Sequence, residues 1–330
     1  MIGSANGTRI GITGLGVCVP DRVVTNDDLA QFVDTTDEWI VERTGIRERR
    51  MVRDDQALTD IGLPAAQAAL ADAGVEAADL DLLISATVTP DMMFPTTSAL
   101  MADALGAERA AAYDLLAGCT GFVYAIAQAY GMLASGLARR VLVVGADVIS
   151  SLLDWDDRST LVLFGDGAGA VVMEPVARGG FLGFELGADG GGGEHLQLPG
   201  SGSRKFANPD QMLKMNGREV YKFATRVLVS SAEAVLAECG KSIDEVDVYV
   251  PHQANKRIID HAVGKLGVPH GRTVVNVDRF GNTSSGSIPL ALADARADGR
   301  LRDGALVLMT GMGAGLTWGS ALLEWTEAQA

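Results

Sequence analysis

The sequence predicts an α/β protein made of two similar layered halves around a pseudo-twofold axis. One observation is a set of six residues that recurs 166 positions later, about half of the 330-residue chain. Another is that each copy runs from an alanine-rich amphipathic helix through a glycine to a short apolar run typical of a buried strand. Such alternation is typical of layered α/β folds. The pairs are Ala66 and Ala232, Ala68 and Ala234, Leu70 and Leu236, Ala71 and Ala237, Gly74 and Gly240, and Asp81 and Asp247.

The same offset places the predicted strands in equivalent positions of the two halves. Apolar runs predict strands at 80–84 and 246–250, and at 141–145 and 307–311. Near the end of each half the offset falls to 150, so the first half carries about 16 extra residues, which we place at 146–165. Insertions of this kind commonly build interfaces or ligand sites. We therefore expect an N-terminal half at 1–176 and a C-terminal half at 177–330.

Composition narrows the class of protein. Apolar residues make up 48% and charged residues 21% of the chain, which favours a folded globular protein over a disordered one. The net charge of −15 argues against nucleic acid or an anionic membrane as a partner. Three widely spaced cysteines do not suggest a disulfide framework, and the first residues lack a secretory signal, so we expect a cytoplasmic protein. The uncharged stretch 115–138 contains four glycines and is interpreted as a helix buried between layers.

Cys119 is the candidate nucleophile. It follows an expected strand at 110–115 and begins the uncharged helix, between Gly118 and Gly121. A helix N-terminus favours a thiolate, so we expect a lowered pKa for this thiol, and the glycines allow a carbonyl group to approach closely. A buried structural cysteine is the alternative interpretation, and it is the one we keep for Cys18 and Cys239.

His252 and Asn282 are the other candidate catalytic residues. His252 directly follows the strand at 246–250, at the carboxyl edge of a sheet, where open α/β sheets bind ligands. Asn282 lies in a glycine-rich turn after another expected strand, and the repeat makes this turn the twin of the one that carries Cys119, with Ser285 opposite Cys119. Both turns should then meet beside His252. An ordinary loop histidine and a helix-capping asparagine are the alternatives.

A glycine-rich segment at 311–319 follows a strand late in the chain. It lacks the lysine and the spacing of a phosphate-binding loop. Its backbone could direct N–H groups, including that of Ala314, at an oxyanion beside Cys119. A tight turn that closes the last strand pair is the alternative interpretation.

Together these motifs resemble the β-ketoacyl-acyl carrier protein synthase III (KAS III) family of the thiolase superfamily. The resemblance covers nearly the whole chain and implies a thiolase-like fold of five layers, αβαβα. The segments that carry it are Thr35–Arg47, Gly118–Gly121, Phe164–Ala170, Val250–Asn255, Gly281–Ser284 and Gly313–Ser320.

The resemblance implies an acyltransferase that begins type II fatty acid biosynthesis. Cys119 would take the acyl group of an acyl-CoA primer, with the backbone N–H groups of Cys119 and Ala314 as the oxyanion hole. Malonyl-acyl carrier protein would then lose CO₂, and its enolate, held by His252 Nε2 and the Asn282 amide, would attack to form 3-oxoacyl-acyl carrier protein. Because loss of CO₂ makes the carbanion, no strong base, metal or other cofactor is expected.

The resemblance also implies sites for CoA and for a second subunit. Trp39 would stack on the adenine of CoA with Arg158 opposite, and Arg43 would lie near the phosphates. Asn255 belongs to the same implied site. Phe94 would close the acyl pocket of the other subunit across a homodimer interface.

Two basic stripes with four-residue spacing stand out in this acidic protein. Because acyl carrier proteins are acidic, we expect these stripes to dock the carrier, and solvated helix faces are the alternative. One member, Arg218, replaces an asparagine that relatives often place along the pantetheine tunnel, which leaves its role open. The stripes are Arg218, Lys222 and Arg226, and Arg257, His261 and Lys265; docking is assigned to Arg218, Lys222, Arg257 and Lys265.

Two other functions remain open at this point. A relative from secondary metabolism would pass the acyl group on Cys119 to a different acceptor, as an ester or amide. A non-catalytic subunit would only bind acyl chains or a carrier protein, which the complete set of Cys119, His252 and Asn282 disfavours.

Overall fold

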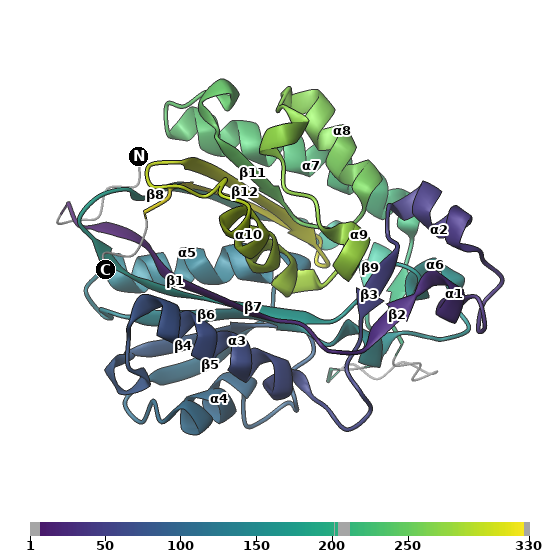
Figure 1. The fold of residues 1–330 in the computed structure, drawn as a ribbon, viewed down its shortest axis with the longest axis horizontal. Helices are drawn as coiled ribbons and strands as arrows, with labels where there is room; N and C mark the ends of the chain where they lie inside the picture. The colour runs from purple at the N-terminus through teal and green to yellow at the C-terminus, as the bar shows by residue number, and fades with distance from the viewer. Residues whose placement is uncertain (1–6, 201, 204–211, 327–330) are drawn as a thin grey trace.

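Two mixed sheets form the centre of the molecule (Figure 1), and the carboxyl ends of the parallel strands β5 and β11 lead to the segments that carry Cys119 and His252. The computed structural model describes residues 7–200, 202–203 and 212–326. The first sheet has the strand order β1-β7-β6-β4-β5 and the second β11-β12-β13-β8. Their bounds are β1 (Arg9–Cys18), β4 (Leu82–Ala86), β5 (Ala111–Leu115), β6 (Val141–Asp147), β7 (Gly167–Val176), β8 (Gly180–Ala188), β11 (Val248–Pro251), β12 (Leu306–Gly313) and β13 (Thr317–Glu324).

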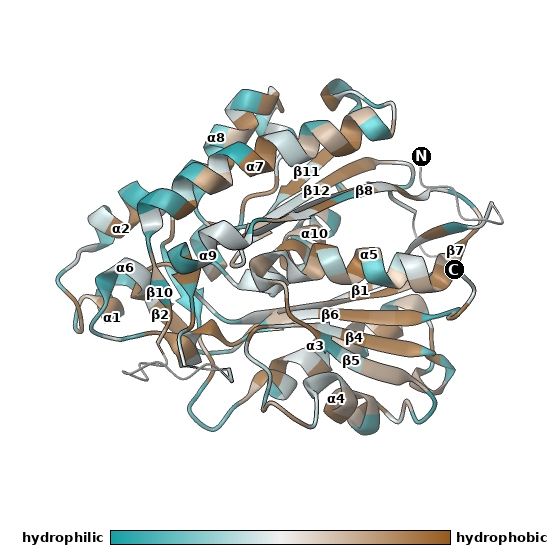
Figure 2. Ribbon diagram, turned by 180° about the vertical axis from the view of Figure 1, so that it is seen from behind, coloured by the Kyte–Doolittle hydropathy of each residue, from teal (hydrophilic) through white to brown (hydrophobic). Residues whose placement is uncertain are grey.

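Helices fill the space between the sheets and cover their outer faces (Figures 1 and 2). Helices α5 (Gly121–Ala134) and α10 (Ser287–Ala297) pack between the sheets in one apolar cluster that includes strand residues of both. The outer layers are α3 (Leu58–Ala73) with α4 (Thr97–Leu105), and α7 (Gly217–Glu238) with α8 (Lys256–Leu266). The predicted five-layer arrangement is confirmed. In the described part of the chain, no helix is both long and apolar enough to cross a membrane.

The 166-residue repeat is visible in the helices that carry the candidate site. It maps the start of α5, Gly121, onto the start of α10, Ser287. It also maps the short 3₁₀ turn Gly118–Thr120 onto the short 3₁₀ turn Ser284–Gly286. The twin turns touch, because the Ser285 hydroxyl donates to the Gly118 carbonyl at 3.3 Å. The pseudo-twofold axis therefore passes close to Cys119.

Three sequence predictions about local structure were inaccurate. The predicted strands at 80–84 and 246–250 begin two residues later, because 3₁₀ turns at Ala77–Asp79 and Ile243–Glu245 precede them. The expected strand before Asn282 is instead a short helix, α9 (Val277–Phe280). Cys119 lies in a 3₁₀ turn, and α5 begins two residues after it.

The extra residues of the first half lie at the end of the molecule where α2 (Asp37–Thr44) is found (Figure 1). They include a 3₁₀ turn, Ile149–Leu152, and α6 (Arg158–Leu161). The buried Arg49 side chain secures this segment by donating to the carbonyl of Val162 at 2.9 Å and to Asn26 Oδ1 at 2.8 Å. The remaining elements are α1 (Asn26–Leu29), β2 (Val23–Thr25), β3 (Glu48–Arg50), β9 (Leu196–Gln197), β10 (Lys214–Met215) and 3₁₀ turns at Gly190–His195 and His270–Arg272.

Candidate active site

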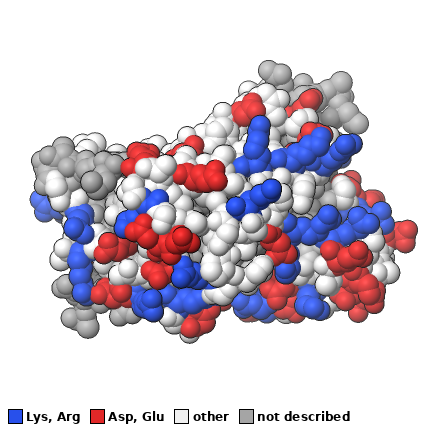
Figure 3. Space-filling model, turned by 90° about the horizontal axis from the view of Figure 1, so that it is seen from above, with Lys and Arg blue, Asp and Glu red and all other residues white. Residues whose placement is uncertain are grey.

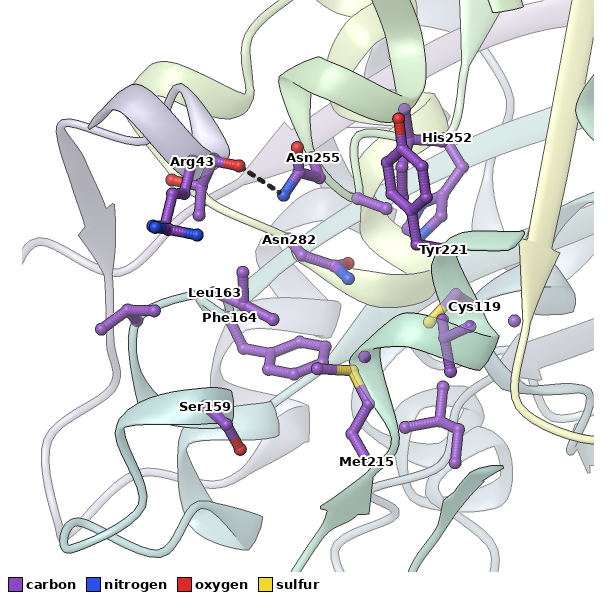
Figure 4. Close-up of a pocket in the computed structure, with 18 of the residues that line it drawn as sticks. Arg43, Cys119, Ser159, Leu163, Phe164, Met215, Tyr221, His252, Asn255 and Asn282 are labelled. Atoms are coloured by element: carbon purple, nitrogen blue, oxygen red, sulfur yellow. Dashed lines mark hydrogen bonds between the residues drawn. The ribbon is translucent and has the colours of Figure 1, made fainter. Parts of the chain in front are cut away.

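A cavity of about 230 Å³ brings the three predicted catalytic side chains together (Figure 4). Cys119, His252 and Asn282 all line it. They come from both halves of the chain, so the cavity depends on the contact between the twin turns. Its outer part is formed by residues of α2, α6, α7 and the start of α8, including Trp39, Arg43, Arg158, Tyr221 and Asn255.

The turn that carries Cys119 is packed against the segment Gly313–Ala314. Gly118 has a φ of +58°, and a Cβ there would lie 2.7 Å from the Ala314 carbonyl oxygen. A Cβ at Gly313 would lie 2.5 Å from the Cys119 nitrogen. Both positions therefore require glycine. This packing brings the N–H of Ala314 to the sulfur of Cys119, which is the arrangement that the predicted oxyanion hole needs.

The prediction that Cys119 has a lowered pKa is wrong for this structure. Burial raises the pKa of the thiol to about 11, although hydrogen bonds from the N–H groups of Cys119 and Ala314 oppose the rise. The side chain is 8% exposed, so the cost of desolvating a thiolate exceeds the stabilisation from the turn. Cys119 is therefore a neutral thiol in the free protein.

His252 lies at the end of β11 with its imidazole in the cavity wall. Its N–H donates to the Thr310 carbonyl at 2.7 Å, which fixes the backbone to β12. Nδ1 lies 2.6 Å from the Ser287 hydroxyl, whereas Nε2 is buried and has no partner in the described structure. Burial lowers the pKa of His252 to about 3. The imidazole is therefore neutral, and its free nitrogen is Nε2.

Asn282 presents a hydrogen-bond donor to the same cavity. Its Oδ1 accepts from the N–H of Ser284 at 2.9 Å, and this contact orients the amide so that Nδ2 is free. The backbone of Asn282 is held by Leu163 and Gly165, with N···O distances of 2.9 and 3.0 Å. Ser284 has a φ of +50°, unusual for a residue other than glycine. The turn is thus held in a costly conformation that aims the amide.

Asp147 does not line the cavity but supports the turn that follows Asn282, and the sequence analysis missed it. It ends β6, is fully buried, and accepts hydrogen bonds from the N–H of Val88 at 2.7 Å and the N–H of Ser285 at 3.0 Å. A third bond comes from the Thr87 hydroxyl at 2.9 Å. Burial raises the pKa of Asp147, and these hydrogen bonds oppose the rise. A carboxylate directly after an apolar strand was the available signal.

The predicted CoA residues gather at the outer end of the cavity. The guanidinium groups of Arg43 and Arg158 lie 4.9 and 4.6 Å from the centre of the Trp39 ring. Arg158 also donates to the Asp34 carbonyl at 2.6 Å. A base between Trp39 and Arg158 would need about 7 Å, ~3.5 Å for each contact. The residues are present, but the space between them is closed.

The predicted docking residues do not all lie together. Arg257 is over the ring of Tyr221, 5.8 Å from its centre, and Tyr221 lines the cavity. Lys222 is paired with Glu219 at 2.7 Å. Lys265 lies at the other end of α8, about 12 Å from Arg257 at ~1.5 Å per residue. Figure 3 shows Lys and Arg side chains on both sides of the face seen from above, interspersed with Asp and Glu and with an extended run on the right.

Comparison with known proteins gives a consistent result. Residues 113–190 match the family 3-oxoacyl-[acyl-carrier-protein] synthase III, and residues 236–325 match its C-terminal family. The curated β-ketoacyl-[acyl-carrier-protein] synthase III of Symbiobacterium thermophilum is 51% identical over 323 residues, which cover 96% of this chain and 98% of the relative.

Solved structures agree with the sequence matches. The β-ketoacyl-[acyl carrier protein] synthase III of Thermus thermophilus has a TM-score of 0.91 and 48% identity, covering 96% of this chain and 100% of that chain. The priming β-ketosynthase of the R1128 polyketide biosynthetic pathway has a TM-score of 0.91 and 37% identity, and the match covers 98% of each chain. With this fold and identity over nearly its whole length, the chain belongs to the 3-oxoacyl-[acyl-carrier-protein] synthase III family.

Proposed function

We propose that this protein condenses an acyl-CoA primer with malonyl-acyl carrier protein, giving 3-oxoacyl-acyl carrier protein, CoA and CO₂. The observation that carries the proposal is the shared cavity, in which one thiol faces His252 Nε2 and Asn282 Nδ2. The role of each residue is part of the proposal. The curated relatives are named for the same synthase activity.

In the first step the Cys119 sulfur attacks the thioester carbonyl of acyl-CoA. The carbonyl oxygen becomes an oxyanion beside the N–H groups of Cys119 and Ala314. The carbon–sulfur bond to CoA then breaks, and the proton of the cysteine thiol ends on the departing CoA sulfur. The products are an acyl thioester on Cys119 and free CoA.

In the second step malonyl-acyl carrier protein enters the emptied cavity. Its carboxylate leaves as CO₂, and the electron pair of that bond forms an enolate on the thioester. His252 Nε2 and Asn282 Nδ2 donate to the enolate oxygen. The enolate carbon then attacks the acyl group, and the carbon–sulfur bond to Cys119 breaks, leaving a thiolate that takes a proton from water to regenerate the thiol. No metal or further cofactor is needed, because decarboxylation supplies the carbanion.

Binding of CoA requires movement of one arginine in this proposal. Arg158 occupies the space where an adenine would stack on Trp39, and within the described residues a single backbone carbonyl, that of Asp34, holds it by a hydrogen bond. Its guanidinium would swing away and then cover the base, while Arg43 pairs with a phosphate. Asn255 would contribute by holding Arg43, since its Nδ2 donates to the Arg43 carbonyl at 3.2 Å.

Two exposed surfaces support the proposed macromolecular partners. Arg257 is exposed and lies over Tyr221, which lines the cavity to which an acidic carrier protein would deliver its substrate. Phe94 is 84% exposed and follows the exposed Met92 and Met93, and Leu116 is exposed directly after the edge strand β5, which supports a homodimer with Phe94 reaching the other subunit. Free cysteines are in keeping with a reducing compartment such as the cytoplasm.

A second function is supported by one comparison. The similarity to a priming β-ketosynthase of a polyketide pathway keeps open a role in secondary metabolism, including transfer of the acyl group to a different acceptor. The two functions share the acyl-Cys119 intermediate and differ in the acceptor that receives its acyl group. A non-catalytic subunit would form no such intermediate.

Intact-mass analysis separates these functions. The protein is incubated with a series of acyl-CoAs, and malonyl-acyl carrier protein is then added. We expect an acyl adduct on Cys119 that disappears as 3-oxoacyl product forms, and no adduct on Cys119→Ala. An adduct that malonyl-acyl carrier protein never converts would favour the second function, and no adduct from any thioester would favour the non-catalytic subunit.

A further inference from the structure

Ser287 is the first residue of α10 and lies directly behind the imidazole of His252. Its Oγ is 2.6 Å from His252 Nδ1 and 3.4 Å from the backbone nitrogen of Gln253. Ser287 and His252 are both 1% exposed, so water does not compete for these groups. The position is the twin of Gly121, which has no side chain, so the repeat itself gives no reason for a hydroxyl here.

The directions of these hydrogen bonds follow from the donors available. The backbone N–H of Gln253 can only donate, so Ser287 Oγ accepts from it. Apart from Nδ1, the described part of the chain places no acceptor within hydrogen-bonding distance of this hydroxyl. Its proton therefore points at Nδ1. A neutral imidazole carries one proton, and with Nδ1 as acceptor that proton is on Nε2.

From this arrangement we propose that Ser287 is a positioning residue that holds His252 in the Nε2–H tautomer. His252 then enters the reaction as a hydrogen-bond donor to the enolate oxygen, and it has no free lone pair with which to accept the Cys119 proton. The inference rests on the proposed function for its consequence in catalysis, but the tautomer itself is a property of the free protein.

Ser287 and Ser284 have parallel effects on the two donors. The N–H of Ser284 occupies Asn282 Oδ1 and leaves the amide donor free, and the hydroxyl of Ser287 occupies His252 Nδ1 and leaves the imidazole donor free. Both contacts come from the segment that starts the helix α10. One short segment thus sets the donor character of the whole pair.

The first test measures the tautomer by NMR on protein labelled with ¹⁵N histidine. The chain has four histidines, so the His252 signals are assigned by their loss in His252→Asn. We expect the ¹⁵N shifts and ring couplings of His252 to show Nε2–H in the wild type and a mixture of both tautomers in Ser287→Ala. An Nδ1–H tautomer in the wild type overturns the proposal, whether or not the protein makes any 3-oxoacyl product.

The second test separates acyl loading from condensation. Ser287→Ala should slow condensation roughly 10- to 100-fold, because one donor is no longer fixed, and should change the rate of Cys119 acylation less than about threefold. Ser320→Ala is the matched control, since it removes a fully buried hydroxyl that bonds Ser231 away from the cavity. Equal loss of loading and condensation, or a condensation rate within about twofold of wild type, would contradict the positioning role.

The two tests also distinguish this inference from the proposed function. If wild-type protein loads no acyl group, the proposed condensation fails, and the NMR result still decides the role of Ser287. If condensation proceeds and Ser287→Ala retains both the tautomer and the rate, only the inference about Ser287 fails.

Discussion

The Ser285 hydroxyl donates a hydrogen bond to the Gly118 carbonyl, and this contact joins the turn that leads from Asn282 to the turn that carries Cys119. The two residues are 167 positions apart and belong to different halves of the chain. Gly313 also packs against Cys119, so three backbone segments meet at this point. Small changes in side-chain volume here should therefore have large effects on the chemistry.

Replacing Gly313 by alanine should block acyl loading. The new Cβ would lie 2.5 Å from the Cys119 nitrogen, so the backbone of one segment would have to shift and the oxyanion hole would open. Loss of one such donor costs about 100- to 1,000-fold in rate. Gly131→Ala is the control, because a Cβ on this α5 glycine meets nothing within 4 Å. Acylation measured by intact mass should fall only in Gly313→Ala, and wild-type loading by that variant would contradict the assignment.

The reactivity of Cys119 should rise steeply with pH. A thiol with a pKa of about 11 is almost entirely protonated at pH 7, and its thiolate fraction grows about tenfold for each pH unit. Alkylation of Cys119 by iodoacetamide, followed by peptide mapping, should therefore increase about 100-fold between pH 7 and pH 9. Cys119→Ser provides the background from Cys18 and Cys239. A plateau near neutral pH would mean that the turn stabilises the thiolate more strongly than burial destabilises it.

The repeat made the Cys119 turn predictable, because an offset that is preserved along the sequence preserves position in the fold. It correctly placed Ser285 opposite Cys119, and thereby placed Asn282 near the thiol. The pKa of Cys119 could not be predicted in the same way. The burial that raises it depends on the whole fold around the thiol, including Gly313, which packs against Cys119 from almost 200 residues away, and the local turn alone suggested the opposite shift.

The helix before Asn282 was missed for a similar reason. The side chain of Gln253 accepts hydrogen bonds from the N–H groups of Asn276 and Val277, at 2.9 and 3.3 Å. In a strand, these N–H groups would instead need acceptors on a neighbouring strand. The equivalent of β5 in this half is reduced to one bridge between Tyr249 and Thr273. Contacts of this kind come from the tertiary structure, so the local sequence pattern favoured a strand.

His252 should make the protein less stable in mild acid. Its pKa is about 3 in the folded state because of burial, but ~6.5 when the chain is unfolded, so below pH 6.5 the unfolded state binds an extra proton. The free energy of unfolding should fall by up to ~1.4 kcal/mol per pH unit from pH 6.5 downwards. Urea unfolding at pH 7 and pH 5 should show a smaller loss for His252→Asn, whereas the exposed His270→Asn should behave like wild type. Equal slopes for all three would contradict burial of the neutral imidazole.

Asp147→Asn should weaken both the fold and the condensation. The amide offers one acceptor oxygen where the carboxylate accepts from Val88, Ser285 and Thr87, so at least one buried donor loses its partner. We expect a loss of ~2 to 4 kcal/mol in the free energy of unfolding. Asp114→Asn is the control, because that half-buried carboxylate accepts two backbone N–H bonds at the start of α4, away from the cavity. Equal condensation rates per folded molecule in both variants would show that Asp147 does not position the Asn282 turn.

Charge reversal on α8 should reveal where the carrier protein docks. Arg257→Glu and Lys265→Glu make the same change of charge at exposed positions on one helix, but only Arg257 contacts a residue that lines the cavity. Because the malonyl group must enter this cavity, Arg257→Glu should raise the apparent KM for malonyl-acyl carrier protein several-fold more than Lys265→Glu, and added salt should reduce the difference. Acylation of Cys119 by acyl-CoA, measured in parallel, should change little in either variant. Equal effects of the two charge reversals on the apparent KM would instead indicate that the docking surface extends along the whole of α8, as the spacing in the sequence suggested.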